Sequence, residues 1–389
     1  MGLSDDRRAL VLGAGLAGAA CAANLIRRGW AVDLLDEADG PAQGASGLPV
    51  GMLSPHVTRA PTPLSRLCAL GVSDARAELE RLLLQGHGWQ ATEVDNLGHD
   101  PGRWPAALVR PAALVRAWLD EAATSGRLTC HWGSRVQRLT RTDGGWQALD
   151  RSERVLGSAP CAVVATAYGA FSLLEGQMGL SVESLPLRPV QGQLSLAPLD
   201  PPPLAERPMR QNGVFVPDFQ DHGLAPAWPP RIWAMGSTYE RGRDDARVTA
   251  EAHERNAHSL DDMHPAAAAR LRRCQADGSL LGWAQVRCAS LDRLPLVGAA
   301  PDIPAMSDMA RSPAQRRRLS DPAAWPRLPG LYLFTALGSR GLTLSHWCAR
   351  WLAARMDDAE SILPPQERDL ERAFDPARFA WRRVRRQGA

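Results

Sequence analysis

The chain has 389 residues, 45% hydrophobic and 22% charged, with a formal net charge of +3. These values are typical of a folded globular protein with material for two or three domains, and so small a net charge does not by itself indicate a nucleic-acid-binding protein. All 45 basic residues are arginine, and the absence of lysine excludes a pyridoxal-phosphate enzyme, a P-loop NTPase and a protein kinase, because each of these needs a lysine at its active site.

The first predicted unit is a strand, a glycine turn and a helix. Apolar residues 9–12 predict a buried parallel strand, and they lead into Gly13-x-Gly15-x-x-Gly18. A helix over 17–28 and a second strand over 31–35 follow. The same stretch imitates a signal peptide or a short membrane span, but the strand–turn–helix pattern is the better interpretation, so no membrane association is expected.

The glycine spacing indicates a dinucleotide-binding turn. The three glycines permit a tight turn, a close approach of the backbone to a pyrophosphate and close helix–strand packing, and the helix N-terminus favours the phosphate charge. Asp36 follows the second strand, where it can accept hydrogen bonds from a ribose. The alternative is a glycine-rich turn without a ligand.

The remaining elements are predicted in chain order. Helices are expected over 74–84 and 111–125, and strands at 134–136 and 161–167. Short antiparallel strands are expected at 193–196, 213–216 and 232–235, followed by helices at 248–258 and 266–273. Residues 301–329 are rich in Pro, Ser, Asp and Arg and predict a surface insertion. A glycine turn at 337–343 opens a last apolar-faced helix over 344–356.

The fingerprint, the Gly-Ala-Ser-Gly loop at 44–47, the strand at 161–167 and the turn at 337–343 together resemble the FAD-dependent D-amino-acid-oxidase-like superfamily, which includes glycine oxidase and sarcosine oxidase. The resemblance implies an α/β, two-domain (α+β) chain in which a Rossmann-like FAD-binding domain is interleaved with an antiparallel-sheet substrate domain. The implied division is FAD-binding at 1–85, 111–184 and 287–364 (with the insertion 301–329), substrate domain at 86–110 and 185–286, and a basic C-terminal tail at 365–389.

The resemblance also implies which residues contact FAD. Asp36 would hold the ribose, Ser46 would lie near the phosphates, Val136 would meet adenine through its backbone, and the turn at 338–343 would lie against the isoalloxazine ring. The complete predicted set is Gly13, Gly15, Leu16, Ala17, Gly18, Asp36, Glu37, Ala45, Ser46, Gly51, Met52, Val136, Ala165, Thr166, Gly338, Ser339, Arg340, Gly341, Leu342 and Thr343.

Four further segments, at 236–242, 287–298, 336–342 and 375–379, resemble one branch of the superfamily: the oxidoreductase domain of a bifunctional enzyme that modifies the wobble uridine of tRNA. That domain removes the carboxymethyl group from carboxymethylaminomethyl-uridine and leaves aminomethyl-uridine. Because the fingerprint starts at residue 13, no fused methyltransferase is expected, and whether a separate methyltransferase acts as a partner is left open. Residues 48–51, Leu-Pro-Val-Gly, depart from the Asn-Arg-Gln-Gly of that branch, which leaves the substrate open.

Arg287 is the predicted carboxylate clamp, because glycine-oxidase-like members place such an arginine five residues before the equivalent of Asp292, and a guanidinium can hold both carboxylate oxygens. Tyr239 and Arg340 are secondary catalytic candidates. The position of the covalent flavin thioether of sarcosine oxidases falls on Gln285, not on Cys288, so noncovalent FAD is predicted. His56 could face the flavin, although a loop histidine is more often only solvated.

Arginines near the C-terminus are candidate tRNA contacts, because arginine neutralises phosphates and aromatic side chains stack on bases. They are Arg378, Arg382, Arg383, Arg385 and Arg386, with Phe379 and Trp381 between them and a second run at 316–318. The alternatives are a small-molecule amine or amino-acid oxidase, and a non-catalytic, FAD-stabilised RNA-binding protein. The seven scattered cysteines include no CxxC pair, and no HExxH occurs, so no metal site and a reduced, cytoplasmic setting are expected.

Overall fold

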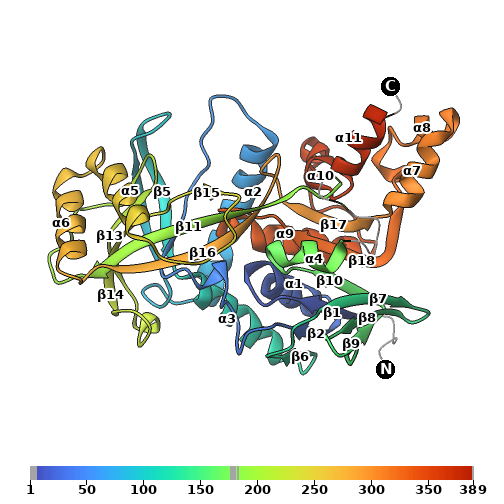
Figure 1. Cartoon of the computed structure of the whole chain (residues 1–389), viewed down its shortest axis with the longest axis horizontal. Helices are drawn as coiled ribbons and strands as arrows, with labels where there is room; N and C mark the ends of the chain where they lie inside the picture. The colour runs from blue at the N-terminus through green and yellow to red at the C-terminus, as the bar shows by residue number, and fades with distance from the viewer. Residues whose placement is uncertain (1–6, 176–180, 182–183, 388–389) are drawn as a thin grey trace.

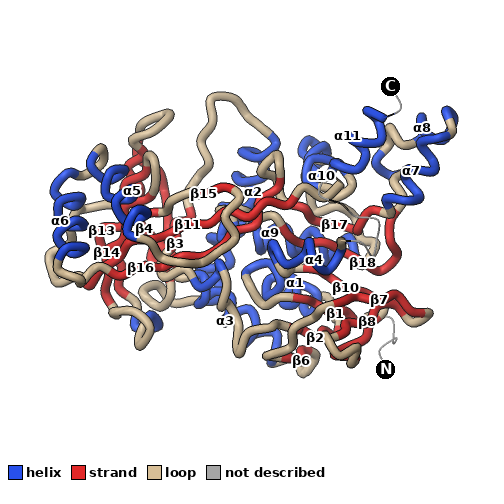
Figure 2. Tube along the Cα trace, viewed as in Figure 1, coloured by secondary structure: helices blue, strands red, loops and turns tan. Residues whose placement is uncertain are grey.

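Two large sheets of different character organise the chain in the computed structural model, which describes residues 7–175, 181 and 184–387 (Figure 1; Figure 2). The helices are α1 (Leu16–Arg27), α2 (Pro63–Leu82), α3 (Pro111–Ala123), α4 (Ala170–Leu174), α5 (Ala250–Asp261), α6 (Pro265–Ala276), α7 (Ile303–Arg311), α8 (Pro313–Arg318), α9 (Gly341–Met356), α10 (Asp369–Phe374) and α11 (Arg378–Gln387). None of these described helices is long and apolar enough to cross a membrane.

The first sheet is the nucleotide-binding sheet, with the strand order β17-β18-β10-β1-β2-β6. Its strands are β1 (Arg8–Leu12), β2 (Ala31–Leu35), β6 (Leu128–His131), β10 (Cys161–Val164), β17 (Leu296–Pro301) and β18 (Arg327–Thr335). All pairs are parallel except β17–β18. Residues 9–12 of β1 are buried because both faces of the sheet are covered, as a parallel sheet requires.

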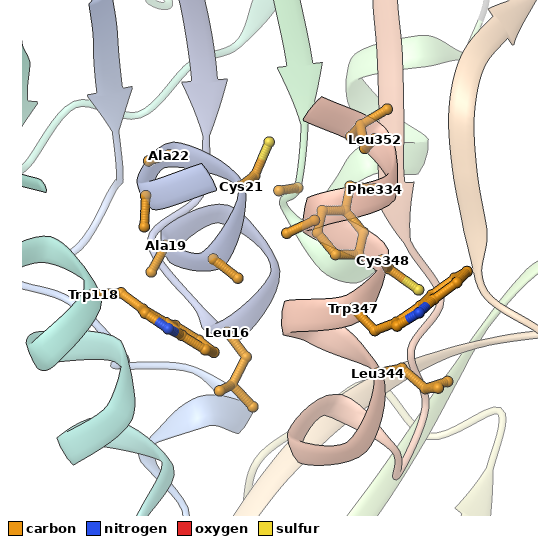
Figure 3. Close-up of a cluster of buried hydrophobic side chains, with 14 of the residues drawn as sticks. Leu16, Ala19, Cys21, Ala22, Trp118, Phe334, Leu344, Trp347, Cys348 and Leu352 are labelled. Atoms are coloured by element: carbon orange, nitrogen blue, oxygen red, sulfur yellow. The ribbon is translucent and has the colours of Figure 1, made fainter. Parts of the chain in front are cut away.

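Helices α1, α3 and α9 cover one face of this sheet, and a small sheet of β7 (Arg138–Thr142), β8 (Gly145–Leu149) and β9 (Val155–Ala159) covers the other. Figure 3 shows α1 between Trp118 of α3 and the side chains of Cys348 and Leu352 of α9. The α1 side chains in this layer are mostly alanines, with Cys21, so the neighbouring helices can approach closely. This packing fixes the N-terminal end of α1, where the glycine turn lies.

The second sheet is largely antiparallel and has the order β15-β11-β14-β13-β12-β4-β5-β3, with β16 paired to β11. Its strands are β3 (Gly51–Leu53), β4 (Trp89–Asn96), β5 (Gly102–Val109), β11 (Leu187–Pro198), β12 (Met209–Arg210), β13 (Val214–Gln220), β14 (Arg231–Gly236), β15 (Glu240–Arg241) and β16 (Leu281–Ser290). Strands β11 and β16 pair over ten residues and extend from α5 and α6 toward the nucleotide-binding sheet (Figure 1). This arrangement confirms the predicted fold class.

Two predicted elements differ from the structure. The helix expected over 74–84 begins eleven residues earlier, at Pro63, because Thr62 and Ser65 form a capping box and proline is favoured in the first turn. The strand expected at 134–136 is wrong: these residues form a loop between β6 and β7. The backbone N–H of Ser134 bonds to the carbonyl of Asp36, 2.8 Å away, instead of to a neighbouring strand.

The C-terminal residues are not a solvated tail. Helix α11 packs on α7 through a separate apolar cluster that contains Met306, Leu319, Trp325, Trp381 and Val384. The predicted surface insertion at 301–329 thus contains α7 and α8 and supplies half of this cluster. Figure 1 shows α7, α8 and α11 grouped at one end of the molecule, away from α5 and α6.

Candidate active site

The glycine turn after β1 is closed by contacts between backbone atoms. Gly13 has φ = +98°, a left-handed conformation that favours glycine, and a Cβ there would lie 2.8 Å from the carbonyl oxygen of Ala165. A Cβ on Gly18 would lie only 1.7 Å from the carbonyl oxygen of Gly13. Both positions therefore exclude a side chain. The loop thus folds back on the end of β10 and leads directly into the N-terminus of α1, the kind of helix end that favours a phosphate.

Two side chains from separate loops hold this turn in place. Asp36 accepts hydrogen bonds from the backbone N–H of Ala14 at 2.6 Å and of Ala38 at 2.9 Å. Ser46 accepts one from the N–H of Leu16, with its Oγ 2.9 Å away. Glu37, in contrast, points outward and pairs with the exposed Arg135. Asp36 and Ser46 thus both hydrogen-bond to the backbone of the glycine turn. Asp36 does so from the end of β2, and Ser46 from the segment before β3.

The predicted flavin-side residues converge on the same turn. A Cβ on Gly341 would lie 2.9 Å from Leu16 Cδ1, and one on Gly51 would lie 2.8 Å from Leu342 Cδ1. Thr166, at the end of β10, has a buried Oγ1 without a hydrogen-bond partner among the described residues. A buried hydroxyl normally has a partner, so a ligand that reaches this loop would supply one. These observations fit a dinucleotide that runs from Asp36 past Ser46 and Thr166 to the start of α9.

Arg287 lies on β16, a strand of the second sheet, with its guanidinium against the backbone of Gly192 on the neighbouring strand β11. A Cβ on Gly192 would lie 2.1 Å from Arg287 Nη2, so only glycine leaves room for this position. Arg287 donates hydrogen bonds to Ser237 Oγ and, over 3.5 Å, to the carbonyl of Thr238. The Gln193 backbone N–H donates to Thr238 Oγ1 at 3.0 Å and fixes this loop. We call Arg287 with Gly192, Ser237 and Thr238 the clamp.

The charge of Arg287 is not compensated by the protein. No carboxylate among the described residues lies within ion-pair distance of it, and burial lowers the pKa of its guanidinium. Tyr239 acts in the opposite direction and raises the pKa of Arg287, although the Tyr239 side chain is itself 45% exposed. Arginine stays protonated in proteins, so the clamp presents a desolvated positive charge that suits a carboxylate from outside.

The two other side chains named from the sequence lie at the start of α9 and on the loop after β3. Arg340 is the N-cap residue of α9, and its charge acts to lower the pKa of the Cys68 thiol, which burial raises more strongly. The turn that carries it touches β16, because the Gly338 N–H donates to the carbonyl of Cys288 at 2.7 Å. His56 lies on the partly buried loop after β3. Sequence reasoning missed Gly192, Ser237 and Thr238, although a glycine inside a buried strand signals a close approach.

Arg378 is wrong as a tRNA contact. Its side chain is 3% exposed, and it donates to Asp292 at 2.8 and 3.1 Å and to the carbonyls of Leu294 and Pro295. It anchors α11 to the β16–β17 turn. Phe379 and Trp381 are also buried, at 5% and 7% exposure, and so cannot stack on bases. The other arginines of α11, Arg382, Arg383, Arg385 and Arg386, are exposed.

Relatives of known sequence share the name of a tRNA-modifying protein. The bifunctional protein MnmC for tRNA 5-methylaminomethyl-2-thiouridine biosynthesis from Ralstonia nicotianae is 34% identical and matches 98% of this chain and 61% of its own length. The protein of the same name from Delftia acidovorans is 36% identical, over 90% of this chain and 58% of its own. The chain thus spans about three fifths of the length of these relatives.

Solved structures share the fold at low sequence identity. Glycine oxidase from Geobacillus kaustophilus superposes with a TM-score of 0.68 at 18% identity, covering 96% of this chain and 99% of the oxidase. Iminodiacetate oxidase from Chelativorans sp. BNC1 gives 0.67 at 19% identity, over 92% and 97% of the two chains. The family model for FAD dependent oxidoreductases (DAO) matches residues 8–107 and 102–355. The chain belongs to this family of FAD-dependent oxidoreductases.

Proposed function

We propose that the chain oxidises carboxymethylaminomethyl-uridine at the wobble position of tRNA to aminomethyl-uridine. The observation that carries the proposal is the clamp: a desolvated arginine without a protein carboxylate fits the carboxylate at the end of this substituent. The tRNA is inferred from the relatives, whose name describes biosynthesis of 5-methylaminomethyl-2-thiouridine in tRNA. Such a modification takes place in the cytoplasm, which is the proposed location.

The clamp would orient the substrate. Its guanidinium holds both carboxylate oxygens, so the carbon between carboxylate and amine takes a fixed position, and fixed geometry of this kind accounts for much of enzymatic rate enhancement. Bound FAD would supply the hydride acceptor for that carbon. The remaining imine is hydrolysed by water, which splits the C–N bond into aminomethyl-uridine and a two-carbon aldehyde acid.

We propose that FAD is held noncovalently by the glycine turn, Asp36, Ser46, Thr166 and the start of α9. Cys288 is the thiol that the sequence analysis considered for a covalent flavin bond. It is 4% exposed, and burial raises its pKa to about 11, so it stays protonated and unreactive. Thr335 Oγ1 lies 3.6 Å from its sulfur. Both observations support a structural thiol.

The exposed arginines of α11 are the proposed distant contacts with the tRNA backbone. Arg382 is half-exposed although it reaches Asp292, and Arg385 and Arg386 face outward. Helix α8, which packs in the same terminal group, adds the exposed Arg317 and Arg318. The exposed arginines of these two helices place positive charge at the same end of the molecule, which suits phosphates (Figure 1).

Flavin reduction under anaerobic conditions tests the function. The FAD-loaded protein is mixed with tRNA that carries the carboxymethylaminomethyl group, with glycine or with sarcosine, and the flavin absorbance is followed. We expect bleaching by the tRNA. Bleaching by the free amino acids alone would identify a small-molecule oxidase, and tRNA binding without bleaching by any substrate would identify a non-catalytic RNA-binding protein.

A further inference from the structure

Arg210, at the end of β12, is a partly buried cation whose hydrogen-bond acceptors among the described residues are all neutral. Its Nη1 donates to Ser54 Oγ at 2.7 Å and to the Pro55 carbonyl at 2.9 Å, and its Nε donates to Asn96 Oδ1 at 3.1 Å. None of the described carboxylates forms an ion pair with it, and burial lowers its pKa. The structure thus fixes this guanidinium beside the loop that carries His56 without neutralising it.

Two other arginines approach the same loop from the nucleotide-binding side. Strand β3, which precedes His56, packs on the first turn of α9, since Gly51 leaves just enough room for Leu342. Arg340 lies two residues before Leu342. Arg293 follows β16 in an exposed turn with φ = +65°, and the bridge between Ala289 and Leu337 joins that strand to the turn of Arg340.

The electrostatics of His56 agree with this placement. Burial and then the charges of Arg340, Arg210 and Arg293 lower its pKa to about 4. No carboxylate acts on it from any of the described elements around it. Asp292, the acid next to Arg293 in the chain, is already paired with Arg378 and Arg382. The three arginines therefore surround a neutral imidazole and form an uncompensated positive region.

This region is connected to the clamp on two sides. The Gly338 N–H bonds to the carbonyl of Cys288, the residue after Arg287. On the other side, Arg210 pairs with Val214, and Val214 pairs with Gly236, which precedes the clamp residue Ser237. Arg210 thus shares the second sheet with Arg287, and Arg340 belongs to the turn that hydrogen-bonds to the strand of Arg287.

We propose that Arg210, Arg293 and Arg340, grouped around His56, bind phosphodiester groups of the RNA backbone next to the modified nucleotide. The proposal rests on the proposed function for the identity of the RNA. The amino-acid part of the substrate carries a single carboxylate, and Arg287 alone matches that charge. Three more uncompensated guanidinium groups call for further negative charges at fixed spacing, which a sugar–phosphate backbone provides and glycine or sarcosine does not.

The test compares tRNA with the free modified nucleoside, which lacks phosphate. FAD-loaded wild-type protein, Arg210→Gln and Arg293→Gln are reduced anaerobically by each substrate. The single variant Arg141→Gln, at an exposed residue of the three-stranded sheet, is the charge-matched control for each. The flavin spectrum and thermal unfolding show whether each variant is folded. Arg293 is exposed, and within the described residues its side chain forms no hydrogen bond or ion pair, so its variant keeps the test valid if Arg210→Gln unfolds.

We expect each variant to raise the half-saturating tRNA concentration by about tenfold and to lower the slope of log affinity against log salt by about 1. The maximal rate and the reduction by nucleoside should stay as in the wild type. Unchanged tRNA affinity and salt slope in the Arg293→Gln variant would overturn the proposal, as would an equal loss with the nucleoside. If the wild-type flavin is reduced by neither substrate, the proposed function fails; tRNA binding by fluorescence anisotropy then decides the arginine region separately.

Discussion

The glycine turn and the clamp are built in different ways. The turn is made of main chain: Gly13, Gly18 and Ala165 touch through backbone atoms, and no side chain fits between them. The clamp is made of one charged side chain that lies on a glycine and on two neutral oxygens. Under the proposed function, backbone shape would control cofactor binding, whereas uncompensated charge would control substrate binding.

Substitution of Gly18 should break the first region completely. In Gly18→Ala the new Cβ meets the Gly13 carbonyl oxygen at 1.7 Å, and neither backbone can move without opening the turn. We expect loss of bound FAD and about 3 kcal/mol or more of stability, at the upper end for overpacking. Gly44→Ala is the matched control, because nothing lies within 4 Å of its Cβ. The flavin-to-protein absorbance ratio measures the effect; full occupancy in Gly18→Ala would contradict the backbone argument.

Removal of the clamp charge should leave the cofactor in place. We expect Arg287→Gln to keep FAD and its unfolding temperature but to slow flavin reduction by roughly 100- to 1,000-fold, as for loss of a preorganised charge at a reacting group. Arg231→Gln, which removes a paired arginine from the same sheet, is the control. Rapid-mixing reduction by the modified tRNA checks this, and a normal rate in Arg287→Gln would refute the clamp.

Arg378, unlike Arg287, is a buried arginine that forms an ion pair with a carboxylate, Asp292. Burial acts to raise the pKa of Asp292, but the hydrogen bonds and charge of Arg378 outweigh it and hold the pKa below its ordinary value. The folded-state pKa is depressed, so the pair stabilises the protein above the unfolded pKa, about 4, and loses this contribution as pH falls through the folded value. Asp292→Asn should therefore cost about 2 kcal/mol at pH 7, with flavin reduction by the nucleoside unaffected.

Denaturant unfolding between pH 7 and pH 3 measures this effect. The difference between wild type and Asp292→Asn should shrink below about pH 4, as the wild-type carboxyl becomes protonated. Asp245→Asn is the control, because Asp245 forms a surface pair with Arg243 and such pairs contribute little. A difference that stays constant with pH would show that the ion pair does not hold α11.

The sequence predicted the local parts of this protein best. The strand, glycine turn, helix and Asp36 lie within one short segment, so the residue spacing in the sequence is enough to predict how they are arranged in space. Arg287 was found only through its resemblance to a family motif, and its partners were not found, because Gly192 and Ser237 lie about 95 and 50 residues before it and meet it only through sheet pairing. Arg378 was misassigned for the same reason: its partner Asp292 is 86 residues away.

The smallest expected effect concerns Gly192. At this residue the shape of the backbone determines where the charged guanidinium of Arg287 can lie. In Gly192→Ala the Cβ would lie 2.1 Å from Arg287 Nη2. The clashing atoms end a flexible side chain, so the fold should survive while the guanidinium moves from Ser237. We expect about a tenfold loss in flavin reduction at low substrate, with FAD retained, since misplacing a charge-assisted hydrogen bond costs about that factor. Gly223→Ala is the matched control, because its Cβ would lie 2.0 Å from Arg110 Nη2, in a pair with Asp221 that belongs to neither region. Equal losses in both variants would mean a general disturbance of the sheet, whereas a loss in Gly192→Ala alone would make Gly192 a positioning residue of the clamp.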